Sequence, residues 1–471
     1  MNLIQENQRT LEHIFPSYQT SEGKAQVLKE TEELFTQFKQ QHFLYPIRYQ
    51  LKKNTFHIKL KRDYSIAPSL EVTSINEVVP VWKYKLDQEL MKLEKRTKKV
   101  FLSDFGGIAD GKTDCTKAFK RAFSVGYRHV ILSSGTYLTR GLKIPSNVIL
   151  AGEGSAETCL KLHPKAPKSE QLLTNKSHFK GNHHIQIKGI SLDWNVERLT
   201  KGETTATGGI ASSGITLAHV KYARIVDVVV KNPGLHGVDI TSPAYSYAGD
   251  GTRSRLGSQF IWVDQIEAFG FGDDGITTHH SKNILISNCY LHHPSGLAHR
   301  TGFSNSNGIE IDDGSEHISL VGNRTAYCFG GVEIKAHETS SAASDTQISG
   351  HFSYRDNRSY NFRHIGHHKD QDLLSQSAYG IRASFLAAYY PQKTDLYKAS
   401  EPRGIVVSAY QRVVVNQFIA REEPTTNHEK VAIAIQYRAR DVRIVNSQLK
   451  NYYGAKQPIK ISKDTSDIYI I

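Results

Sequence analysis

One short pattern recurs along most of this sequence: a glycine followed by alternating apolar and polar residues. The clearest copies are Gly275-Ile-Thr-Thr-His279, Gly308-Ile-Glu-Ile-Asp312 and Gly331-Val-Glu-Ile-Lys335. Alternation with a period of two is typical of a short strand with one buried face. Strand repeats spaced like these predict a solenoid. We therefore predict an all-β fold: a right-handed parallel β-helix, wound as a single-stranded solenoid.

Further copies of the pattern flank this central region. They begin at Gly237, Gly380, Gly404 and, in a weaker form, Val431, so that successive copies lie 23 to 49 residues apart. Equivalent strands of a β-helix stack about 4.8 Å apart. The second and fourth residues after each glycine then form two columns on the outer face. The predicted columns are Asp239, Thr277, Glu310, Glu333, Arg382 and Thr241, His279, Asp312, Lys335, Ser384.

The first column places several carboxylates above one another. Stacked carboxylates raise each other's pKa, and a raised pKa suits a carboxyl group to general acid catalysis. The alternative is an outer face whose charges only interact with solvent. Both interpretations stay open at the level of the sequence.

The first 97 residues differ from the rest of the chain. Helical spacing is visible in residues 5–15 and 21–41, and residues 85–99 form a basic helix or linker. We predict a small N-terminal α/β module over residues 1–97, which attaches or caps the solenoid, and a β-helix domain over residues 98–471.

The formal net charge of +13 indicates an anionic partner, such as an acidic glycan, a phosphate-bearing cell-wall polymer or nucleic acid. No nucleic-acid-binding motif accompanies that charge, so nucleic acid is not expected. No apolar run reaches the length of a membrane span. The N-terminus has no recognisable signal peptide.

The start of the predicted solenoid carries a specific set of motifs. These are Asp104-Phe-Gly, Asp110-Gly, Thr113-Asp114, Ala118, Gly135-Thr-Tyr and Gly152-Glu-Gly. With the repeats that follow, roughly residues 100–450 resemble the pectate-lyase-like right-handed β-helix superfamily. That superfamily includes polygalacturonase-type glycoside hydrolases and phage or bacterial polysaccharide depolymerases. The resemblance implies a glycan as the substrate or ligand.

The polygalacturonase site residues are matched only in part. Gly272-Asp-Asp-Gly275 resembles the family's paired-aspartate strand, and Gly331 to Lys335 resembles its Arg-Ile-Lys strand. Asn307 stands where the family has the histidine of Gly-His-Gly. Leu235-His236-Gly237 stands where the family has Asn-Thr-Asp.

A glycosidase needs one carboxylic acid to protonate the leaving oxygen and a second carboxylate as base or nucleophile. The predicted catalytic residues are Asp273, Asp274, Glu310 and Glu333. The predicted substrate-binding residues are Asp239, His279, Asp312, Lys335, Arg382 and His236. We therefore predict a glycoside hydrolase acting on an anionic bacterial surface or extracellular polysaccharide.

Two other functions remain open. A polysaccharide lyase would need a base, for which Lys335, Arg382 or a histidine is available. A non-catalytic adhesin or phage receptor-binding β-helix would grip the glycan without cleaving it. No cofactor and no dedicated metal ligand are expected, although Asp312-Asp313-Gly314 is a plausible Ca²⁺-binding turn. The expected location is extracellular or on a virion, with a homotrimer or virion attachment formed through the N-terminal module.

Overall fold

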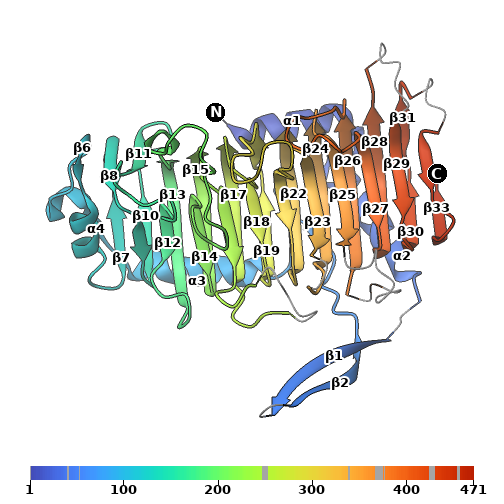
Figure 1. The fold of residues 1–471 in the computed structure, drawn as a ribbon, viewed down its shortest axis with the longest axis horizontal. Coiled ribbons are helices and arrows are strands. Elements are labelled where there is room, and N and C mark those ends of the chain that lie inside the picture. Colours follow the sequence, from blue (N-terminus) through green and yellow to red (C-terminus); the bar gives the residue numbers. More distant parts are fainter. Residues whose placement is uncertain are drawn as a thin grey trace.

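The structure is a computed structural model, and its long parallel sheets confirm the right-handed parallel β-helix (Figure 1). It describes residues 2–39, 42–51, 54–246, 253–337, 340–365, 375, 377–423, 430–452 and 457–471, with the side chains of residues 42–63 excepted. The described strands of the solenoid form two parallel sheets of 11 and 18 strands.

The 11-stranded sheet carries the glycine pattern. Its strands are β9 (Leu142–Ile144), β12 (Leu173–Asn175), β14 (Ile215–Ala218), β16 (Val238–Thr241), β18 (Ile276–Thr278), β21 (Asn307–Ile311), β23 (Gly330–Ala336), β25 (Arg358–His364), β27 (Arg403–Ser408), β29 (Val431–Gln436) and β32 (Ile459–Ile461).

The 18-stranded sheet forms the remaining walls of each coil. Its strands are β5 (Lys98–Phe101), β6 (Asp110–Asp114), β7 (Arg128–Ile131), β8 (Gly135–Thr139), β10 (Val148–Ala151), β11 (Thr158–Leu162), β13 (Asn182–Asp193), β15 (Val220–Lys231), β17 (Gln259–Phe269), β19 (Lys282–Ser287), β20 (Tyr290–His292), β22 (Glu316–Ala326), β24 (Ser344–Tyr354), β26 (Tyr379–Tyr389), β28 (Gln411–Arg421), β30 (Arg440–Val445), β31 (Gln448–Lys450) and β33 (Ser466–Ile470).

The repeated glycines stack on one another in successive coils, and we call this stack the glycine ladder. Each glycine lies so close to the next that neither position has room for a side chain. A Cβ atom added to Gly237 would lie 2.4 Å from the carbonyl oxygen of Gly275, and one added to Gly275 would lie 2.6 Å from that of Gly308. Real Cβ atoms do not approach oxygen so closely, so a side chain would push adjacent coils apart. The pattern therefore repeats because the backbones of successive coils touch at this position.

One copy of the predicted pattern is wrong. Gly380 lies in β26 of the larger sheet, where it has a φ of +80° and is not part of the ladder. The strand that follows β23 in the smaller sheet is instead β25, and Ser359 occupies the ladder position of β25. Because serine stands there in place of glycine, the repeat is hidden in the sequence.

The apolar residues of the pattern face the interior as predicted. Ile309, Ile311, Val332 and Ile334 are all fully buried in one continuous core that runs the length of the solenoid. Their burial confirms the strand register on which the site prediction depends.

Each coil bends sharply at the residue that follows its strand in the larger sheet, and we call these positions the row of corners. The corner residues Gly270, His293, Tyr327, Arg355 and Tyr390 have φ between 47° and 66°, the left-handed region. They stack along the solenoid because the residues preceding them are paired between coils. The loops that leave this row of corners carry the candidate site.

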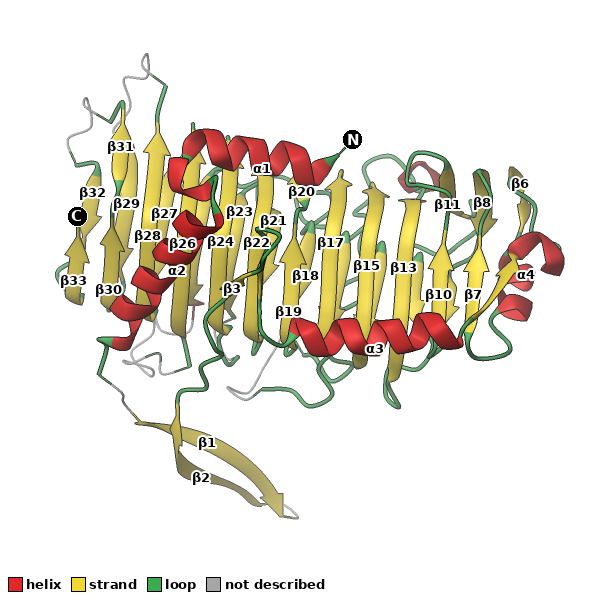
Figure 2. Cartoon of the chain, turned by 180° about the vertical axis from the view of Figure 1, so that it is seen from behind, coloured by secondary structure: helices red, strands yellow, loops and turns green. Residues whose placement is uncertain are grey.

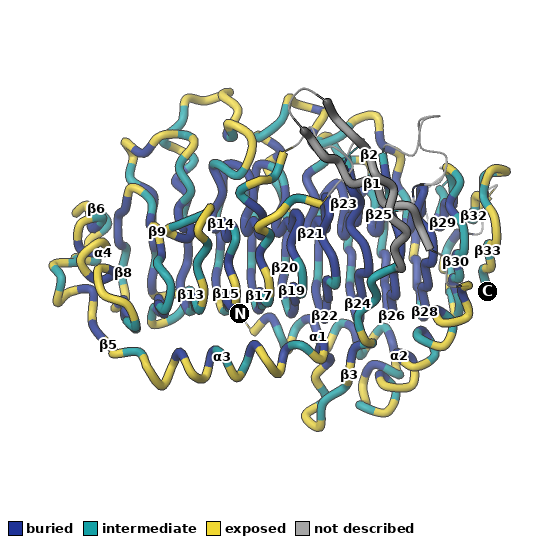
Figure 3. The backbone as a smooth tube through the Cα atoms, turned by 90° about the horizontal axis from the view of Figure 1, so that it is seen from below, coloured by how far each residue is buried: buried dark blue, intermediate teal, exposed yellow. Residues whose placement is uncertain are grey.

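The N-terminal helices α1 (Leu3–Ile14), α2 (Ser21–Thr36) and α3 (Lys83–Arg96) lie along the outside of the larger sheet (Figure 2). Buried side chains of α1 and α2, among them Leu11 and Phe35, pack on Phe385 and Val414 of the sheet. Figure 3 shows that α3 presents a largely exposed outer face. These helices therefore cover a side of the solenoid, and their predicted attachment role stays a prediction.

Several shorter elements complete the chain. Helix α4 (Thr116–Ala122) lies at one end of the solenoid in Figure 1, while the hairpin of β1 (His42–Leu51) and β2 (Asn54–Asp63) stands away from the coils. The strands β3 (Glu71–Val72) and β4 (Val78–Val79) pair near α2. Among the helices that the structure describes, none is long and apolar enough to cross a membrane.

Candidate active site

The candidate site lies where the row of corners meets the smaller sheet. Asp273 and Asp274 follow the corner residue Gly270 in the turn from β17 to β18, and His299 comes from the loop between β20 and β21. Strands β16, β18, β21, β23 and β25, with the residues directly next to them, supply the rest. The parallel register places Asp239, Thr277, Glu310 and Glu333 in one column, as predicted for these four positions.

The two adjacent aspartates share a histidine. His236 Nε2 lies 3.6 Å from Asp273 Oδ2 and 3.6 Å from Asp274 Oδ2. The donor atoms of this trio all lie within 4.8 Å of one another. On the other side of Asp273, His299 Nε2 lies 2.9 Å from Oδ1, outside good hydrogen-bonding alignment, so we treat this contact as an ion pair.

The surroundings push the pKa values of the two aspartates in opposite directions. Burial, followed by the nearby charges of Asp273 and Glu310, raises the pKa of Asp274 well above its ordinary value. Burial would also raise the pKa of Asp273, but its interactions with His236 and His299 outweigh this and lower it. Asp273 is therefore ionised over a pH range in which Asp274 keeps its proton.

Hydrogen bonds fix the position of that proton. Asp274 Oδ1 accepts from the backbone N–H of Asn307 at 2.9 Å and from its side-chain Nδ2 at 3.0 Å. An oxygen that accepts two N–H groups cannot readily carry the acid proton, so the proton lies on Oδ2, the oxygen 3.6 Å from His236 Nε2. Asn307, which stands in place of the family's histidine, thus orients the acid.

Glu310 forms an ion pair with Lys335 next to the two aspartates. Its Oε2 lies 2.7 Å from Lys335 Nζ and accepts from Asn307 Nδ2 at 2.7 Å. Burial alone would lower the pKa of Lys335, but the carboxylates around it, Asp312 first, raise it well above its ordinary value. Glu310 and Lys335 therefore form a buried ion pair that is linked to Asp274 through Asn307.

Asp239 lies between two histidines. Its Oδ2 is 3.8 Å from His236 Nδ1 and its Oδ1 is 3.6 Å from His279 Nδ1, and neither oxygen has a hydrogen-bond partner among the described residues. Burial would raise the pKa of Asp239, but the two histidines lower it to about 2. A fully buried carboxylate in this position favours the protonated form of His236, whose pKa is raised well above its ordinary value.

A second acidic group borders the first. Asp313 Oδ2 lies 2.8 Å from His337 Nδ1, and Asp312 Oδ2 lies 3.7 Å from the same nitrogen. Asp312 Oδ2 is also 3.7 Å from His279 Nε2. Burial would lower the pKa of His337, but the neighbouring Asp312 and Asp313 outweigh it and raise that pKa.

Glu333 is fully buried and forms an ion pair with Arg363 of β25. Arg382, in contrast, lies in the larger sheet beneath the N-terminal segment. It contacts Glu32 and Asp345 at 2.7 Å each. Its predicted place in the column of acids is wrong, because Gly380 lies in β26 of the larger sheet and not in the glycine ladder.

The predicted outer face is not open to solvent. The column residues do point away from the apolar core, yet Glu310 and Asp312 are only 3% and 1% exposed. The loop between β16 and β17 adds Tyr245, whose ring packs 4.2 Å from that of His279. Asp273 and His299 keep exposed side-chain fractions of 17% and 35%. Asp273 and His299 are therefore the acid and the histidine of the cluster through which solvent reaches it.

Three residues of the cluster were not predicted: His299, His337 and Arg363. His299 lies in an irregular loop without periodicity, and Arg363 lies in the coil whose ladder glycine is absent. His337 lies two residues beyond the repeat that ends at Lys335, and this closeness to the alternating pattern was the available signal.

Three groups offer donor atoms for a metal ion: His236 with Asp273 and Asp274, His279 with Glu310 and Asp312, and Asp312 with Asp313 and His337. Ca²⁺ prefers a shell of oxygen ligands. Each group contains a histidine, and Lys335 already occupies the space beside Glu310 and Asp312 at 2.7 and 3.6 Å. This donor set fits Ca²⁺ poorly.

Comparisons with known proteins place the chain among β-helix proteins. The family model "Rhamnogalacturonase A/epimerase, pectate lyase-like" matches residues 100–333. The chain is 42% identical over 393 residues to the putative phage-related protein YobO of Bacillus subtilis (strain 168), covering 83% of this chain and 48% of YobO. It is 40% identical over 366 residues to the pre-neck appendage protein of Bacillus phage phi29, covering 77% of this chain and 42% of that protein.

A solved structure agrees with these sequence similarities. The crystal structure of the N-terminal fragment of phage phi29 gene product 12 has a TM-score of 0.74 and 36% identity, covering 82% of this chain and 64% of that fragment. The chain thus spans about half the length of the curated relatives it matches or less.

Proposed function

Because the chain belongs to the pectate-lyase-like superfamily of right-handed β-helix proteins, we propose that it is a glycoside hydrolase that cleaves an anionic bacterial surface polysaccharide. The observation that carries this proposal is the pair Asp273 and Asp274. Two neighbouring carboxyl groups whose pKa values are driven apart are the requirement for acid and base roles at one site.

In the proposed mechanism, Asp274 is the general acid. Its Oδ2 gives a proton to the glycosidic oxygen as the bond to the anomeric carbon breaks. The Asp273 carboxylate attacks that carbon and forms a glycosyl ester. A water molecule then hydrolyses the ester, and the Asp274 carboxylate takes the proton of that water.

The separation of the pair favours retention of configuration. One carboxylate oxygen of Asp273 and one of Asp274 lie within 4.8 Å of each other. Retaining glycosidases place their carboxyl groups about 5–5.5 Å apart, whereas inverting enzymes need about 6.5–9.5 Å to admit water. The other acids play supporting roles: Glu310 helps keep Asp274 protonated, and Asp239 helps keep His236 charged.

A hydrolase is favoured over a lyase by the state of the candidate bases. Lys335 is buried against Glu310 and has a raised pKa, so it is protonated and cannot abstract a proton. Arg382 lies outside the cluster. Two of the bases that the sequence offered for β-elimination are therefore lost.

We also propose that the protein acts as part of a phage appendage. Its relatives include a phage-related protein of Bacillus subtilis and the pre-neck appendage protein of phage phi29. A polysaccharide of the bacterial surface is what such an appendage would encounter. The net charge of +13 suits an anionic polymer.

The test uses polysaccharide purified from Bacillus subtilis cell walls, because the relatives come from this organism and from Bacillus phages. A hydrolase releases new reducing ends without unsaturated products. Products that absorb in the ultraviolet would instead reveal a lyase. Binding without any new ends would identify a non-catalytic receptor-binding protein and overturn the proposal.

A further inference from the structure

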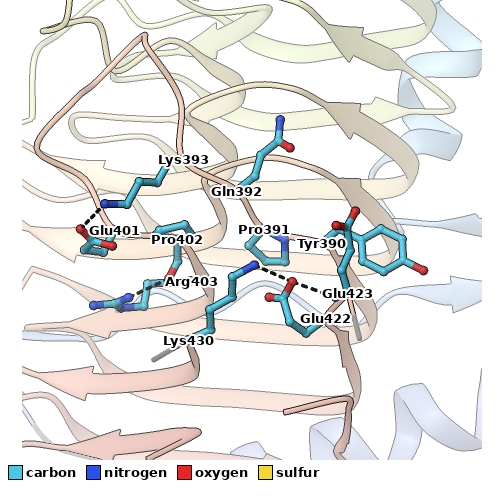
Figure 4. Close-up of a pocket in the computed structure, with 10 residues that line it drawn as sticks. All are labelled: Tyr390, Pro391, Gln392, Lys393, Glu401, Pro402, Arg403, Glu422, Glu423 and Lys430. Carbon is cyan, nitrogen blue, oxygen red and sulfur yellow. Dashed lines mark hydrogen bonds and ion pairs between the residues drawn. The ribbon is translucent and has the colours of Figure 1, made fainter. Parts of the chain in front are cut away.

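A cavity of about 550 Å³ lies on the same row of corners, nearer the C-terminus (Figure 4). The loop between β26 and β27 and the first residue of β27 form one wall, with Tyr390, Pro391 and Arg403. The loop between β28 and β29 contributes Glu422 and Lys430. The cavity has apolar surfaces and charged groups together, which is the composition of a sugar-binding pocket.

Glu422 is placed in the cavity with one oxygen unused. The residue is 3% exposed, and its Oε1 lies 2.6 Å from Lys430 Nζ. Its Oε2 is buried and has no hydrogen-bond partner among the residues that the structure describes. A buried carboxylate oxygen without a donor is costly unless a ligand supplies one. A sugar hydroxyl is such a donor.

Arg403 supplies the opposite charge. Its Nη1 donates to the carbonyl oxygen of Pro402 at 2.7 Å, and no described carboxylate lies within 4.0 Å of its guanidinium. A guanidinium that keeps donors free binds a carboxylate or a phosphate group well. Tyr390 and Pro391 offer apolar surface to the face of a sugar ring.

The strand register gives the position of the cavity relative to the candidate active site. Phe269 lies four residues before Asp273 and pairs with His292 of the next coil. The same column continues, one residue per coil, through Ala326, Tyr354, Tyr389 and Arg421. Arg421 directly precedes Glu422. The cavity therefore lies four to five coils from Asp273. At about 4.8 Å per coil, this is roughly 19–24 Å along the solenoid axis.

Backbone contacts join the two places. The loop between β26 and β27 reaches back to the loop that carries His299, where Ser304 N donates to Leu396 O at 2.8 Å and Phe303 packs against Tyr397. The loops that border the candidate active site and the cavity are thus in direct contact with each other.

We propose that this cavity is a distal subsite that binds an anionic sugar unit of a polysaccharide chain lying along the solenoid axis. The inference rests on the proposed function insofar as the same chain reaches Asp273 and Asp274. Binding at the cavity requires no cleavage, so the two can be tested separately.

The test measures the affinity of the full-length protein for long fragments of Bacillus subtilis cell-wall polysaccharide. The Asp274→Asn background prevents cleavage during the measurement. Arg403→Met and Glu422→Gln each remove one charge of the cavity at nearly constant volume. We expect each to raise the Kd about tenfold, the effect of losing one charge-assisted hydrogen bond. Arg443→Met, an arginine paired with Asp467 on the other sheet, is the matched control.

Hydrogen exchange gives a second readout that does not depend on one substitution. The glycan is expected to protect backbone amides in residues 403–408, and Arg403→Met is expected to abolish that protection. Equal affinity of all three variants, or equal weakening by Arg443→Met, would overturn the subsite. So would a parent protein that does not bind the glycan. A wild-type protein that binds through the cavity but releases no reducing ends would overturn the hydrolase alone.

Discussion

The pKa values of Asp273 and Asp274 differ because the two identical carboxyl groups have different neighbours. Asp273 faces two histidines and keeps some contact with solvent, whereas Asp274 is buried beside two other acids. Neighbouring carboxyl groups disfavour each other's ionisation, so the more buried of the two keeps its proton. The result is one proton held at a defined oxygen of a defined residue.

Asp274→Asn removes this proton and keeps the shape of the neutral acid. Positioned acid–base groups contribute about 10²–10⁴-fold to rate, so we expect kcat on the cell-wall polysaccharide to fall by this factor. Reducing-end release measures it. The control is Asp264→Asn, a buried aspartate that accepts from Ser287 and Asn288 in the other sheet and is expected to keep full kcat once folded. Unchanged turnover in Asp274→Asn would move the reaction to another site.

The raised pKa of Asp274 also predicts how rate and stability depend on pH. The rate should fall as pH rises through that pKa, because the acid loses its proton. A carboxyl group with a raised folded-state pKa stabilises the fold below its unfolded value near 3.8, and this is lost as pH rises through the folded value. The wild type should therefore lose Tm relative to Asp274→Asn as pH increases. Parallel Tm curves for the two proteins would contradict the shift.

At the scale of the element, the strands of the smaller sheet have two different faces. Ile311 of β21 points into the apolar core, while Glu310 beside it points into the polar cluster, and both are buried. Such a strand must satisfy a packed core on one side and a set of ion pairs on the other. Its conformation is therefore fixed from both sides.

Ile311→Ala tests the core side of this strand. Deleting buried methyl groups from a packed core costs about 2–5 kcal/mol, and we expect a loss of unfolding free energy in this range. Chemical denaturation measures it. Ile75→Ala is the control, because Ile75 is 73% exposed and should lose almost nothing. Equal losses at the two positions would show that the register of β21 is wrong.

Gly275→Ala tests the glycine ladder. The added methyl group would lie 2.6 Å from the carbonyl oxygen of Gly308, so the coils must separate locally. Overpacking of this kind costs about 1–3 kcal/mol, and a lower denaturation midpoint should report it. At Gly126 an added Cβ meets no atom within 4 Å, so Gly126→Ala should be neutral or slightly stabilising. A neutral Gly275→Ala would remove the steric reason for the repeat.

At the scale of the whole molecule, the N-terminal helices pack on the outside of the solenoid that the rest of the chain forms. Helices α1 and α2 lie against β22 to β28, although about 280 to 400 residues separate them in sequence. Leu11, Phe15 and Tyr18 pack on Phe385, and Phe35 packs on Val414. The N-terminal segment thus protects apolar side chains on the outside of the larger sheet.

Deleting residues 1–39 should therefore destabilise the solenoid. Each apolar side chain that loses its cover forfeits about 1.5–3 kcal/mol, and several are uncovered together. We expect a lower Tm and binding of a hydrophobic dye. Replacing residues 42–63 by a short linker is the control, because that hairpin stands away from the coils (Figure 1). A truncated protein with an unchanged Tm would mean that the helices are only peripheral.

The sequence by itself determined the strands and their inner faces. Alternation and a glycine at the coil contact are local requirements, so they are visible in each repeat without knowledge of the others. The same reasoning placed Asp273 and Asp274 next to a ladder glycine. It also placed Glu310 and Glu333 in one column, as the register confirms.

Only the tertiary structure decided which coil follows which and what surrounds the acids. The coil with Ser359 does not show the glycine pattern, so the sequence placed Arg382 after Glu333, where the fold has Asn361. It also missed Arg363, which pairs with Lys335 in the neighbouring column. The direction of each pKa shift was also beyond the sequence. Desolvation and charge depend on every group within a few ångströms, and His299 reaches Asp273 from an irregular loop. Contacts of this kind leave no periodic trace, because loop closure and burial are properties of the assembled solenoid.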